Sequence, residues 1–569
     1  MNKDVSEELM SLCKRRGYIW PSFELYGGVA GMFDYGPLGS AMRNNILVAW
    51  RDIYIGREGF VEIDSETVNP EDVFKASGHV DEFSDYITTC RECKLPFRAD
   101  HLVEGLCENP DTLSAGELEK AFLEFDIKCP ECSGDLGKVD EFNLMFKTTI
   151  GPGSSRTGYL RPETAQGIFV NFQNLYRYNR EKLPLGVIQT GRGYRNEISP
   201  RQGMIRMREF NMMEVELFVD PEDKDWSRFP DVENEELVLL PSSGTETVVK
   251  TVKQSVDEGF IANRVLAYFI CTTKQLLVRL GVDPSKLRFR QHLADEMAHY
   301  AADCWDAEVL LSYGWTEVTG VADRGCWDLS RHSEFSGTDL SHFKKFDEPM
   351  EMTFEKVVAN HRKLGPQFKD KAKAIASTLE TKIADDIKDG KIVLDIDGEE
   401  IILTDEFFEV RKVTEKVNGE RVIPHVIEPS YGLDRIFYSV LEHAYFFDEK
   451  RDYSVLRLAP EVAPIKVGVF PLMDKDGLDV MAKDVFANVH SACSPAYYDD
   501  SGTIGKRYAR MDEIGTPWCI TVDYESLKGP DEGTVTIRER DTGNQKRIPA
   551  DRAAEIVMQL IHGLEFSKV

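Results

Sequence analysis

Residues 183–219 read LPLGVIQTGRGYRNEISPRQGMIRMREFNMMEVELFV, and this stretch decides the fold. It alternates loop and strand character and has no helical period before its end, which predicts a strand, a loop and a returning strand. Between residues 192 and 208 it holds five arginines against one acid, in a chain that is strongly acidic overall. Arginine is always charged and presents a rigid fork of donors, so it suits bidentate contact with phosphate oxygens. The stretch predicts a polyphosphate site; a surface hairpin with a solvated basic face is the alternative.

Glycines and a proline accompany these arginines and favour the binding site over the bland hairpin. They shape a tight turn whose flanks can approach a ligand closely, because glycine has no side chain and tolerates unusual backbone angles. The arginines are Arg192, Arg195, Arg201, Arg206 and Arg208, and the turn residues are Gly191, Gly193, Pro200 and Gly203.

A second unusual stretch, HVIEPSYGLDRIFYSVLEHAYFF, occupies residues 425–447. Val426 and Ile427 indicate a strand, and an apolar helix follows Gly432. A helix N-terminus favours anions, and Arg435 adds a full positive charge there. An ordinary strand-to-helix junction is the alternative interpretation.

A third stretch, residues 37–55, places Leu38, Met42, Ile46, Trp50 and Tyr54 at four-residue steps, which predicts an amphipathic helix. The sequence GFVEIDSETVNP at 59–70 follows and predicts a strand that ends at Pro70, because proline cannot donate to a sheet ladder.

Length and composition indicate a folded protein of several domains. The chain has 569 residues, of which 42% are apolar and 29% charged. The first twenty residues lack a signal-peptide core, and no apolar run approaches the ~20 residues that span a bilayer. We therefore expect a cytoplasmic protein with no membrane partner.

The net charge of -29 argues against a nucleic-acid partner if taken alone. After Pro464, short apolar strands alternate with helices, which predicts a separate small α/β domain. Residues 461–569 hold 13 Lys and Arg against 18 Asp and Glu, so any nucleic-acid surface must be local.

Together the three stretches resemble the three motifs of class II aminoacyl-tRNA synthetases. The match is closer still to the glycyl-tRNA synthetase family of the homodimeric archaeal and eukaryotic type, and it runs from roughly Gly17 to the C-terminus. The strings that carry it are CKLPFRADHL, FNLMFKT, YLRPETAQGIF, GRGYRNEISPRQGMIRMREFNMMEVE, GWTEVTGVADRGCWDLSRH and IEPSYGLDR, in that family's order.

The resemblance implies an α+β fold: a class II catalytic domain with a central antiparallel sheet, interrupted by insertions, and a C-terminal α/β anticodon-binding domain. It also implies a homodimer joined through the first motif. The expected divisions are catalytic core at 1–84, a zinc lobe at 85–140, core at 141–220, an insertion at 221–290, core at 291–345, an insertion at 346–420, core at 421–460, and the anticodon-binding domain at 461–569.

For ATP, the resemblance implies that Arg195 clamps the α-phosphate, Glu197 reads the adenine amino group, Phe210 stacks on adenine and Arg435 grips the γ-phosphate. Glu317 matches a nucleotide contact and is a candidate magnesium ligand. The full ATP set is Arg195, Asn196, Glu197, Ile205, Arg206, Met207, Phe210, Glu317, Val318, Gly432 and Arg435, with Arg195 and Arg435 as the catalytic pair.

For glycine, the matching positions are Arg98, Glu163, Glu214, Glu428, Pro429 and Ser430. A glycine zwitterion presents an ammonium and a carboxylate with almost nothing between them, so several acids and one base fit it. Large acids converging on the α-carbon also leave no volume for a methyl group. Overpacking costs ~1–3 kcal/mol, which corresponds to roughly 10- to 100-fold selectivity against alanine.

The implied reaction is glycine–tRNA ligation: glycine attacks ATP to give glycyl-adenylate, and the glycyl group then passes to the 3′ end of tRNA(Gly). Positioning and charge stabilisation by arginine and magnesium would suffice, so we nominate no general base. Members of the family can also make diadenosine tetraphosphate, which the sequence neither supports nor excludes.

Two rival functions have distinct signatures. A synthetase-like polymerase accessory subunit would have lost the arginines of the second or third motif, and this chain keeps both. A synthetase for serine, threonine or proline would share the phosphate machinery without this cluster of glutamates.

The cysteines include two Cys-x-x-Cys pairs, Cys90 with Cys93 and Cys129 with Cys132. Four thiolates at this spacing predict a structural zinc site. Four free thiols are the alternative, and redox pairs lack a thioredoxin-like context. Arg98 follows the first pair, so the lobe could place a substrate-binding arginine.

The remaining candidates carry plainer interpretations. His79 is not promoted to the site as a lone histidine, and the isolated cysteines are interpreted as core thiols. Candidate tRNA contacts in the last domain, with a solvated mixed-charge face as the alternative, are Lys506, Arg507, Arg510, Arg538 and Arg540.

Overall fold

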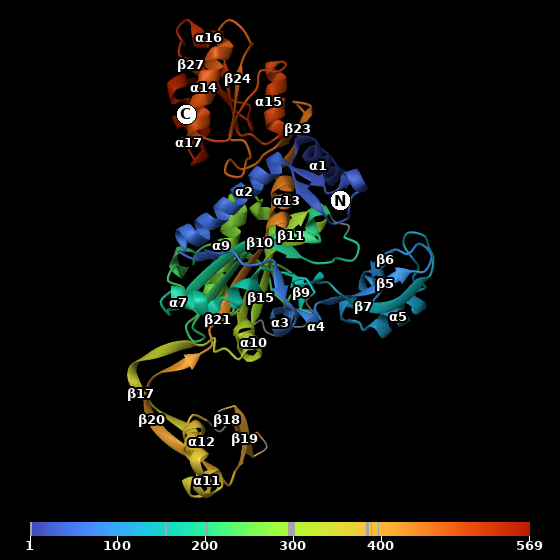
Figure 1. Cartoon of the computed structure of the whole chain (residues 1–569). Coiled ribbons are helices and arrows are strands. Elements are labelled where there is room, and N and C mark those ends of the chain that lie inside the picture. Colours follow the sequence, from blue (N-terminus) through green and yellow to red (C-terminus); the bar gives the residue numbers. More distant parts are fainter. Residues whose placement is uncertain are drawn as a thin grey trace. The chain divides into compact units, whose positions relative to one another are not determined.

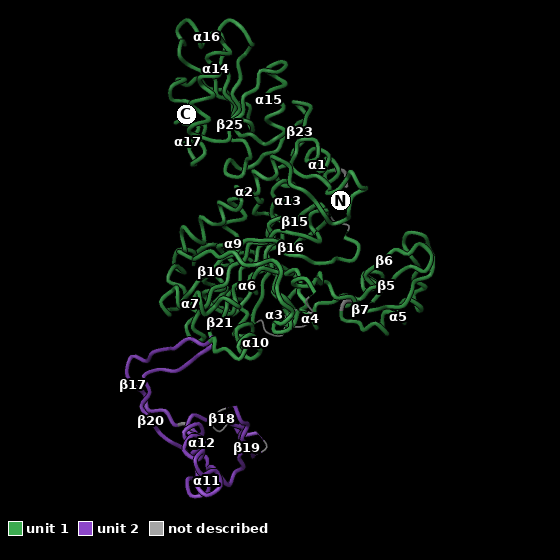
Figure 2. Tube along the Cα trace, viewed as in Figure 1, with its two compact units in different colours: residues 1–340, 424–569 green, residues 341–423 purple. Residues whose placement is uncertain are grey.

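The computed structural model describes residues 3–107, 109–153, 156–200, 203–293, 302–382, 386–388, 390–396 and 398–569. The chain forms two compact units (Figure 2). The larger unit comprises residues 1–340 and 424–569, and the smaller unit comprises residues 341–423. Among the described residues, no helix has both the length and the apolar character that crossing a membrane requires.

A nine-stranded sheet forms the centre of the larger unit (Figure 1). Neighbouring strands are antiparallel except for the pairs β12–β14 and β10–β3. In spatial order the strands are β13 (Val248–Thr251), β12 (Glu236–Leu240), β14 (Leu287–Gln291), β15 (Asp303–Leu311), β16 (Gly314–Gly325), β21 (His425–Gly432), β11 (Glu209–Val219), β10 (Leu185–Tyr194) and β3 (Val61–Ile63).

The two faces of this sheet differ in character because side chains alternate along each strand. On β11, Met213, Val215 and Leu217 point into the main hydrophobic core. Helices that contribute residues to that core include α1 (Lys3–Arg16), α2 (Pro37–Arg51), α9 (Arg264–Arg279) and α13 (Leu433–Ala444). Glu214 and Glu216, which alternate with these apolar residues, face the other side. The shorter helices α6 (Ala165–Phe169), which contacts β11, and α10 (Trp327–Ser336), which packs on α6, lie beyond them.

The predicted strand-loop-strand is present as β10 and β11, joined through the short helical turn Gly203–Ile205. The predicted helix at 37–55 is also present, as α2 continued by a π-helical turn at Asp52–Arg57. The single strand predicted at 59–70 is wrong. It is two strands, β3 beside β10 and β4 (Val68–Pro70) beside β9 (Thr157–Leu160). Between them Arg161 donates to the Ser65 carbonyl at 2.9 Å, where the chain leaves the sheet.

The prediction that residues 221–290 form an insertion is also wrong. Strands β12, β13 and β14 hydrogen-bond within the central sheet, and α9 packs against β15, β16 and β21. This stretch is therefore part of the catalytic core. The sequence did not indicate this, because acidic surface loops separate its apolar strands.

A lobe built on its own small core occupies the chain between β4 and β8 (Lys147–Thr149). It contains the three-stranded sheet β6-β5-β7 and helix α5. The elements are β5 (Ser84–Cys90), β6 (Pro96–Arg98), α5 (Ala115–Glu124) and β7 (Leu136–Asn143).

The smaller unit, residues 341–423, is slightly longer than the insertion predicted at 346–420 and has its own core. The segment IVLDIDGEEIIL forms the antiparallel strands β18 and β19. Before these strands lie two short helices, α11 and α12, which are separated at Lys369, whose φ is positive. The elements are β17 (His342–Ala359), α11 (His361–Phe368), α12 (Ala372–Leu379), β18 (Lys391–Ile396), β19 (Glu399–Thr404) and β20 (Phe408–Val422).

The C-terminal domain has the predicted alternation of strands and helices around a separate core. Its five-stranded sheet has the order β25-β24-β26-β27-β28. The elements are β24 (Val467–Pro471), α14 (Leu478–Ala492), β25 (Ala496–Tyr498), α15 (Ile504–Glu513), β26 (Trp518–Val522), β27 (Thr534–Glu539), β28 (Gln545–Pro549) and α17 (Ala553–Ile561).

Candidate active site

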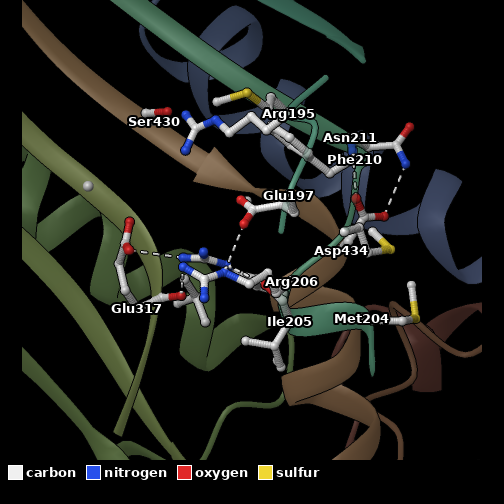
Figure 3. Close-up of a pocket in the computed structure, with 16 residues that line it drawn as sticks. Arg195, Glu197, Met204, Ile205, Arg206, Phe210, Asn211, Glu317, Ser430 and Asp434 are labelled. Atoms are coloured by element: carbon white, nitrogen blue, oxygen red, sulfur yellow. Dashed lines mark hydrogen bonds and ion pairs between the residues drawn. The ribbon is translucent and has the colours of Figure 1, made fainter. Parts of the chain in front are cut away.

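A pocket lies where β11, β16 and β21 meet the first turn of α13 (Figure 3). All members of the predicted ATP set except Asn196 line it. The backbone N–H of Asn196 donates to the Leu144 carbonyl at 2.7 Å, next to the lining residues Arg195 and Glu197. The lining residues are Arg195, Glu197, Met204, Ile205, Arg206, Met207, Phe210, Asn211, Met212, Glu317, Val318, Gly320, Ser430, Gly432, Asp434 and Arg435.

Arg195 is held between two aromatic rings. Its guanidinium carbon lies 5.2 Å from the ring centre of Phe83 and 5.4 Å from that of Phe210. Its Nε donates to the Pro162 carbonyl at 3.4 Å. In Figure 3 its guanidinium extends across the pocket toward Ser430. The planar cation is therefore oriented by stacking, which suits contact with a phosphate.

Arg435 enters the pocket from the first turn of α13. It donates to the Ile205 carbonyl at 3.1 Å and to the backbone carbonyl and carboxylate of Glu317 at 2.9 Å each. This ion pair lowers the pKa of Glu317. Two arginines far apart in the sequence thus line one cavity, as the predicted phosphate site requires.

Of the four described arginines in the stretch 192–208, Arg195 and Arg206 line the pocket. Arg206 faces the Glu197 carboxylate at 3.2 Å. Arg208 closes the loop by donating to the carbonyls of Glu197 and Ala30, and Arg192 pairs with Glu209 away from the pocket. Arg201 lies outside the described residues. Among the described arginines, Arg195 and Arg206 therefore lie where the polyphosphate interpretation expects them.

Asp434 was missed by the sequence analysis. It is buried, and it accepts hydrogen bonds from the Asn211 backbone N–H at 2.5 Å, from Asn211 Nδ2 at 3.0 Å and from the Tyr35 hydroxyl. It ties α13 to β11 beneath the pocket. An acid in the first turn of a helix was the available signal.

The predicted glycine-binding glutamates lie together behind this pocket, on the polar face of the sheet. Ser430 joins the two regions, because it lines the pocket and donates to Glu214 at 3.2 Å. Glu214 also accepts the Thr164 backbone N–H at 2.6 Å and the Thr164 hydroxyl. Glu163 lies 3.5 Å from His79 and accepts from Gln166 at 2.9 Å.

Glu428 is held by Arg324, a residue that the sequence analysis did not single out. Arg324 donates to Glu428 at 2.8 Å and, through two nitrogens, to Asp328 at 2.8 and 3.0 Å. Gln166 links Asp328 to Glu163, since its amide donates to both. The strings RPETAQGIF and GVADRGCWDLSRH contained these residues, but only Glu163 was taken from them.

The glutamates differ in their protonation. Burial would raise the pKa of Glu163, but His79, Arg324 and Gln166 hold it well below its ordinary value. Burial, Glu163 and Glu428 raise the pKa of Glu214 to about 8. Burial also raises the pKa of Glu428, against the opposing effect of Arg324. The cluster is therefore short of positive charge, which is the condition that an ammonium group relieves.

Two members of the predicted glycine-binding set, Arg98 and Pro429, are not part of this cluster of glutamates. Arg98, on β6 of the lobe, pairs with Asp85 at 3.1 Å and with Asp100, and its charge acts on Glu197. These contacts place Arg98 beside Asp85 and Asp100, with Glu197 of the nucleotide pocket close enough to act on its charge. Pro429 is a buried strand residue between Glu428 and Ser430.

The four predicted zinc ligands gather in the lobe. Their sulfur atoms all lie within 4.8 Å of one another, with Cys90 to Cys132 at 3.5 Å and Cys93 to Cys129 at 3.6 Å. A tetrahedral zinc with bonds of 2.3 Å separates its sulfurs by about 3.8 Å. Four free thiols in this arrangement fit such an ion.

Comparison with known proteins is consistent with this geometry. Residues 148–444 match the family described as "tRNA synthetase class II core domain (G, H, P, S and T)". Residues 466–560 match the "Anticodon binding domain". The chain is also similar to the solved Giardia lamblia prolyl-tRNA synthetase in complex with prolyl-adenylate, with a TM-score of 0.53 and 14% identity over 98% of this chain and 79% of that one. The fold and its pocket thus define a class II aminoacyl-tRNA synthetase.

Full-length relatives narrow the assignment. The chain is 50% identical to the glycine--tRNA ligase of Methanothrix thermoacetophila over 566 residues, which is 98% of each chain. It is 47% identical to the glycine--tRNA ligase of Methanocaldococcus jannaschii, over 98% of this chain and 99% of that one. The chain belongs to the glycine--tRNA ligase family.

Proposed function

We propose that this chain joins glycine to the 3′ end of tRNA(Gly) in two steps, through glycyl-adenylate formed from glycine and ATP. The observation that carries this proposal is that Ser430 joins a pocket with two arginines to a buried cluster of glutamates. Membership of the glycine--tRNA ligase family supports the same activity.

ATP would occupy the pocket of Figure 3 with its phosphates between Arg195 and Arg435. Adenine would stack on Phe210 and present its amino group to Glu197. Figure 3 supports this division, because Arg195 and Phe210 lie on one side, Arg206 and Glu317 lie on the other, and the Glu197 carboxylate lies between them.

Glycine would place its ammonium against Glu163, Glu214 and Glu428. Because these carboxylates converge from three separate elements, a methyl group on the α-carbon would overlap one of them. The hydrogen bonds of the glutamates to Thr164, Gln166 and Arg324 make the pocket stiff, which strengthens exclusion by shape.

The chemistry would need positioning more than proton transfer. Arg195 and Arg435 stabilise the charge that develops on the phosphates, in a pocket whose donors are already oriented. A magnesium ion bound with ATP would neutralise phosphate charge, and Glu317 is the carboxylate in the pocket that fits it by its oxygen donors.

Zinc would stabilise the lobe through Cys90, Cys93, Cys129 and Cys132. Its role would be structural, because four thiolates complete the coordination of zinc and leave no open position. The lobe would then hold Arg98 near the nucleotide.

The C-terminal domain would contact the tRNA anticodon, and the chain would act as a homodimer in the cytoplasm. Five basic residues of this domain are predicted tRNA contacts, and their burial reduces the number that can reach a tRNA. Arg507, Arg538 and Arg540 are buried in contacts with the chain itself, and Arg510 pairs with Asp499 at 2.5 Å. Lys506, which is exposed, is the remaining candidate of that set.

Pyrophosphate exchange with each of the twenty amino acids in turn tests the proposal. Glycine alone should stimulate exchange of label between pyrophosphate and ATP. A response of similar size to alanine or serine would overturn the specificity, and no response to glycine would overturn the activity.

A further inference from the structure

Glu216 is a buried acid to which neither the mechanism nor the family resemblance assigns a role. Its side chain is 0% exposed, and among the described residues neither carboxyl oxygen has a hydrogen-bond partner. It lies on β11, two residues beyond Glu214 and on the same face of the sheet. An unpartnered polar group at this depth costs ~1–3 kcal/mol, so a role for it must be sought.

The strand register places Glu216 opposite Glu428. On β11 and β21, Glu214 pairs with Ser430 and Leu217 pairs with Ile427, which sets Glu216 across from Glu428. Directly opposed residues on antiparallel strands have their β-carbons about 4.5–5.5 Å apart, within reach of two glutamate side chains. On the other side of β11 the partner is Val187, which does not titrate.

The other acids around Glu216 differ from it because each of them accepts hydrogen bonds from the protein. Arg324 of β16 serves both Glu428 of β21 and Asp328 of α10. Glu214 of β11 accepts from Thr164 and Ser430. Glu216 has no such donor, so it is the member of the cluster that is least able to hold a negative charge. Burial, followed by the nearby charge of Glu428, accordingly raises the pKa of Glu216 well above its ordinary value.

We propose that Glu216 is a neutral carboxylic acid that donates its proton in a hydrogen bond to Glu428 and so positions Glu428 for the ammonium group of the substrate. This rests on the proposed function, since the substrate is glycine. Glu216 acts through Glu428 and does not touch the substrate; it is a positioning residue. Because its proton stays on Glu216, Glu428 keeps its negative charge for Arg324 and for the ammonium.

Three variants of the full chain test this role in glycine-dependent pyrophosphate exchange. Glu216→Gln keeps a donor without a charge, Glu216→Met keeps the volume without a donor, and Glu209→Gln is a control at the other end of the same strand. We expect the KM for glycine to stay within ~3-fold in E216Q and E209Q and to rise ~10-fold in E216M, which is the loss of one hydrogen bond. The KM for ATP should be unchanged in all three.

A spectroscopic measurement separates this role from a structural one. At neutral pH and without substrate, the infrared difference spectrum between the parent and E216Q should contain a protonated-carboxyl band that the difference between the parent and E209Q lacks. Thermal unfolding should show E216Q and E209Q as stable as the parent and E216M less stable, because Glu428 loses a donor in E216M alone.

Two results would overturn the proposal: a KM for glycine in E216Q that rises as far as in E216M, or an infrared band unchanged by E216Q. The first would mean that Glu216 acts as a charge and the second that it is ionised. If the parent chain showed no glycine-dependent exchange, the proposed function would fail instead, and the infrared comparison would still decide the protonation of Glu216.

Discussion

The guanidinium of Arg435 lies 2.9 Å from the carboxylate of Glu317 and donates to its backbone carbonyl at the same distance. The contact joins the first turn of α13 to β16 at the edge of the nucleotide pocket. A terminal phosphate that binds Arg435 must either displace this carboxylate or share a cation with it. The carboxylate of Glu317 therefore occupies the position beside Arg435 where the negative charge of a phosphate is expected.

Removing either pocket arginine should abolish most of the activation step. Arg195→Ala and Arg435→Ala should each lower the rate of glycine-dependent pyrophosphate exchange by ~100-fold or more, the usual loss of one preorganised charge donor. Arg192→Ala is the matched control, because Arg192 comes from the same stretch but pairs with Glu209 outside the pocket. An equal loss in the control would remove the distinction between these arginines.

Arg324 predicts a coupled loss of stability and glycine affinity. Arg324→Met leaves Glu428 and Asp328 buried without their cation, which should lower the free energy of unfolding by ~3 kcal/mol. The KM for glycine should rise while the KM for ATP stays constant. Arg331→Met is the control. It removes the more exposed ion pair between Arg331 and Glu334 of α10, and it should change neither the free energy of unfolding nor the KM for glycine appreciably. Urea unfolding and exchange kinetics provide the measurements.

The raised pKa of Glu214 predicts how the free energy of unfolding depends on pH. Its pKa is raised from 4.5 to about 8, so between these values the folded chain binds more protons than the unfolded chain. The contribution of Glu214 to stability is therefore largest at low pH and declines as the pH rises through this window. Glu214→Gln should remove that decline, which urea titrations from pH 5 to about 8 would measure.

The same group predicts the pH dependence of glycine binding. An ammonium favours ionised Glu214, so binding should release a proton, and the KM for glycine should fall by at most ~10-fold per unit as the pH rises toward 8. A KM that is constant across this range would contradict the assigned ionisation.

Phe210 predicts a nucleotide effect that spares glycine. Phe210→Ala removes an aromatic face that also supports Arg195, so the KM for ATP should rise by ~10-fold or more, the usual value of base stacking. Phe210→Tyr keeps the face and should retain the parent KM. If alanine and tyrosine behave alike, adenine does not stack at this position.

The sequence predicted the strands of the site better than the roles of their side chains. In MMEVELF the acids alternate with apolar residues, which is the pattern of a strand with one face in solvent. Glu214 and Glu216 are in fact buried, because α6 covers that face. Alternation distinguishes two faces of a strand, but it cannot tell solvent from a buried polar cavity. Glu214 was found only through resemblance, and Glu216 was not found.

Long-range contacts account for the other differences. Arg192, Arg195 and Arg208 look equivalent in the sequence, but the strand pairing turns the first outward and the loop uses the last as a clamp. Arg324 gives no local signal, because its importance depends on Glu428, which only the sheet brings beside it.

The cysteine cluster predicts a metal dependence that can be separated from catalysis. The isolated chain should contain one zinc per chain, and Cys129→Ser should lose it, whereas Cys107→Ser is a matched control in the same lobe and outside the cluster. Because β6 begins three residues after Cys93, loss of zinc should free Arg98 and slow pyrophosphate exchange as well as expose the lobe to protease. Metal analysis and limited proteolysis measure these effects without relying on activity. Equal zinc in the two variants would show that the four thiols do not bind it, and normal exchange in a zinc-free Cys129→Ser would show that Arg98 does not depend on the metal.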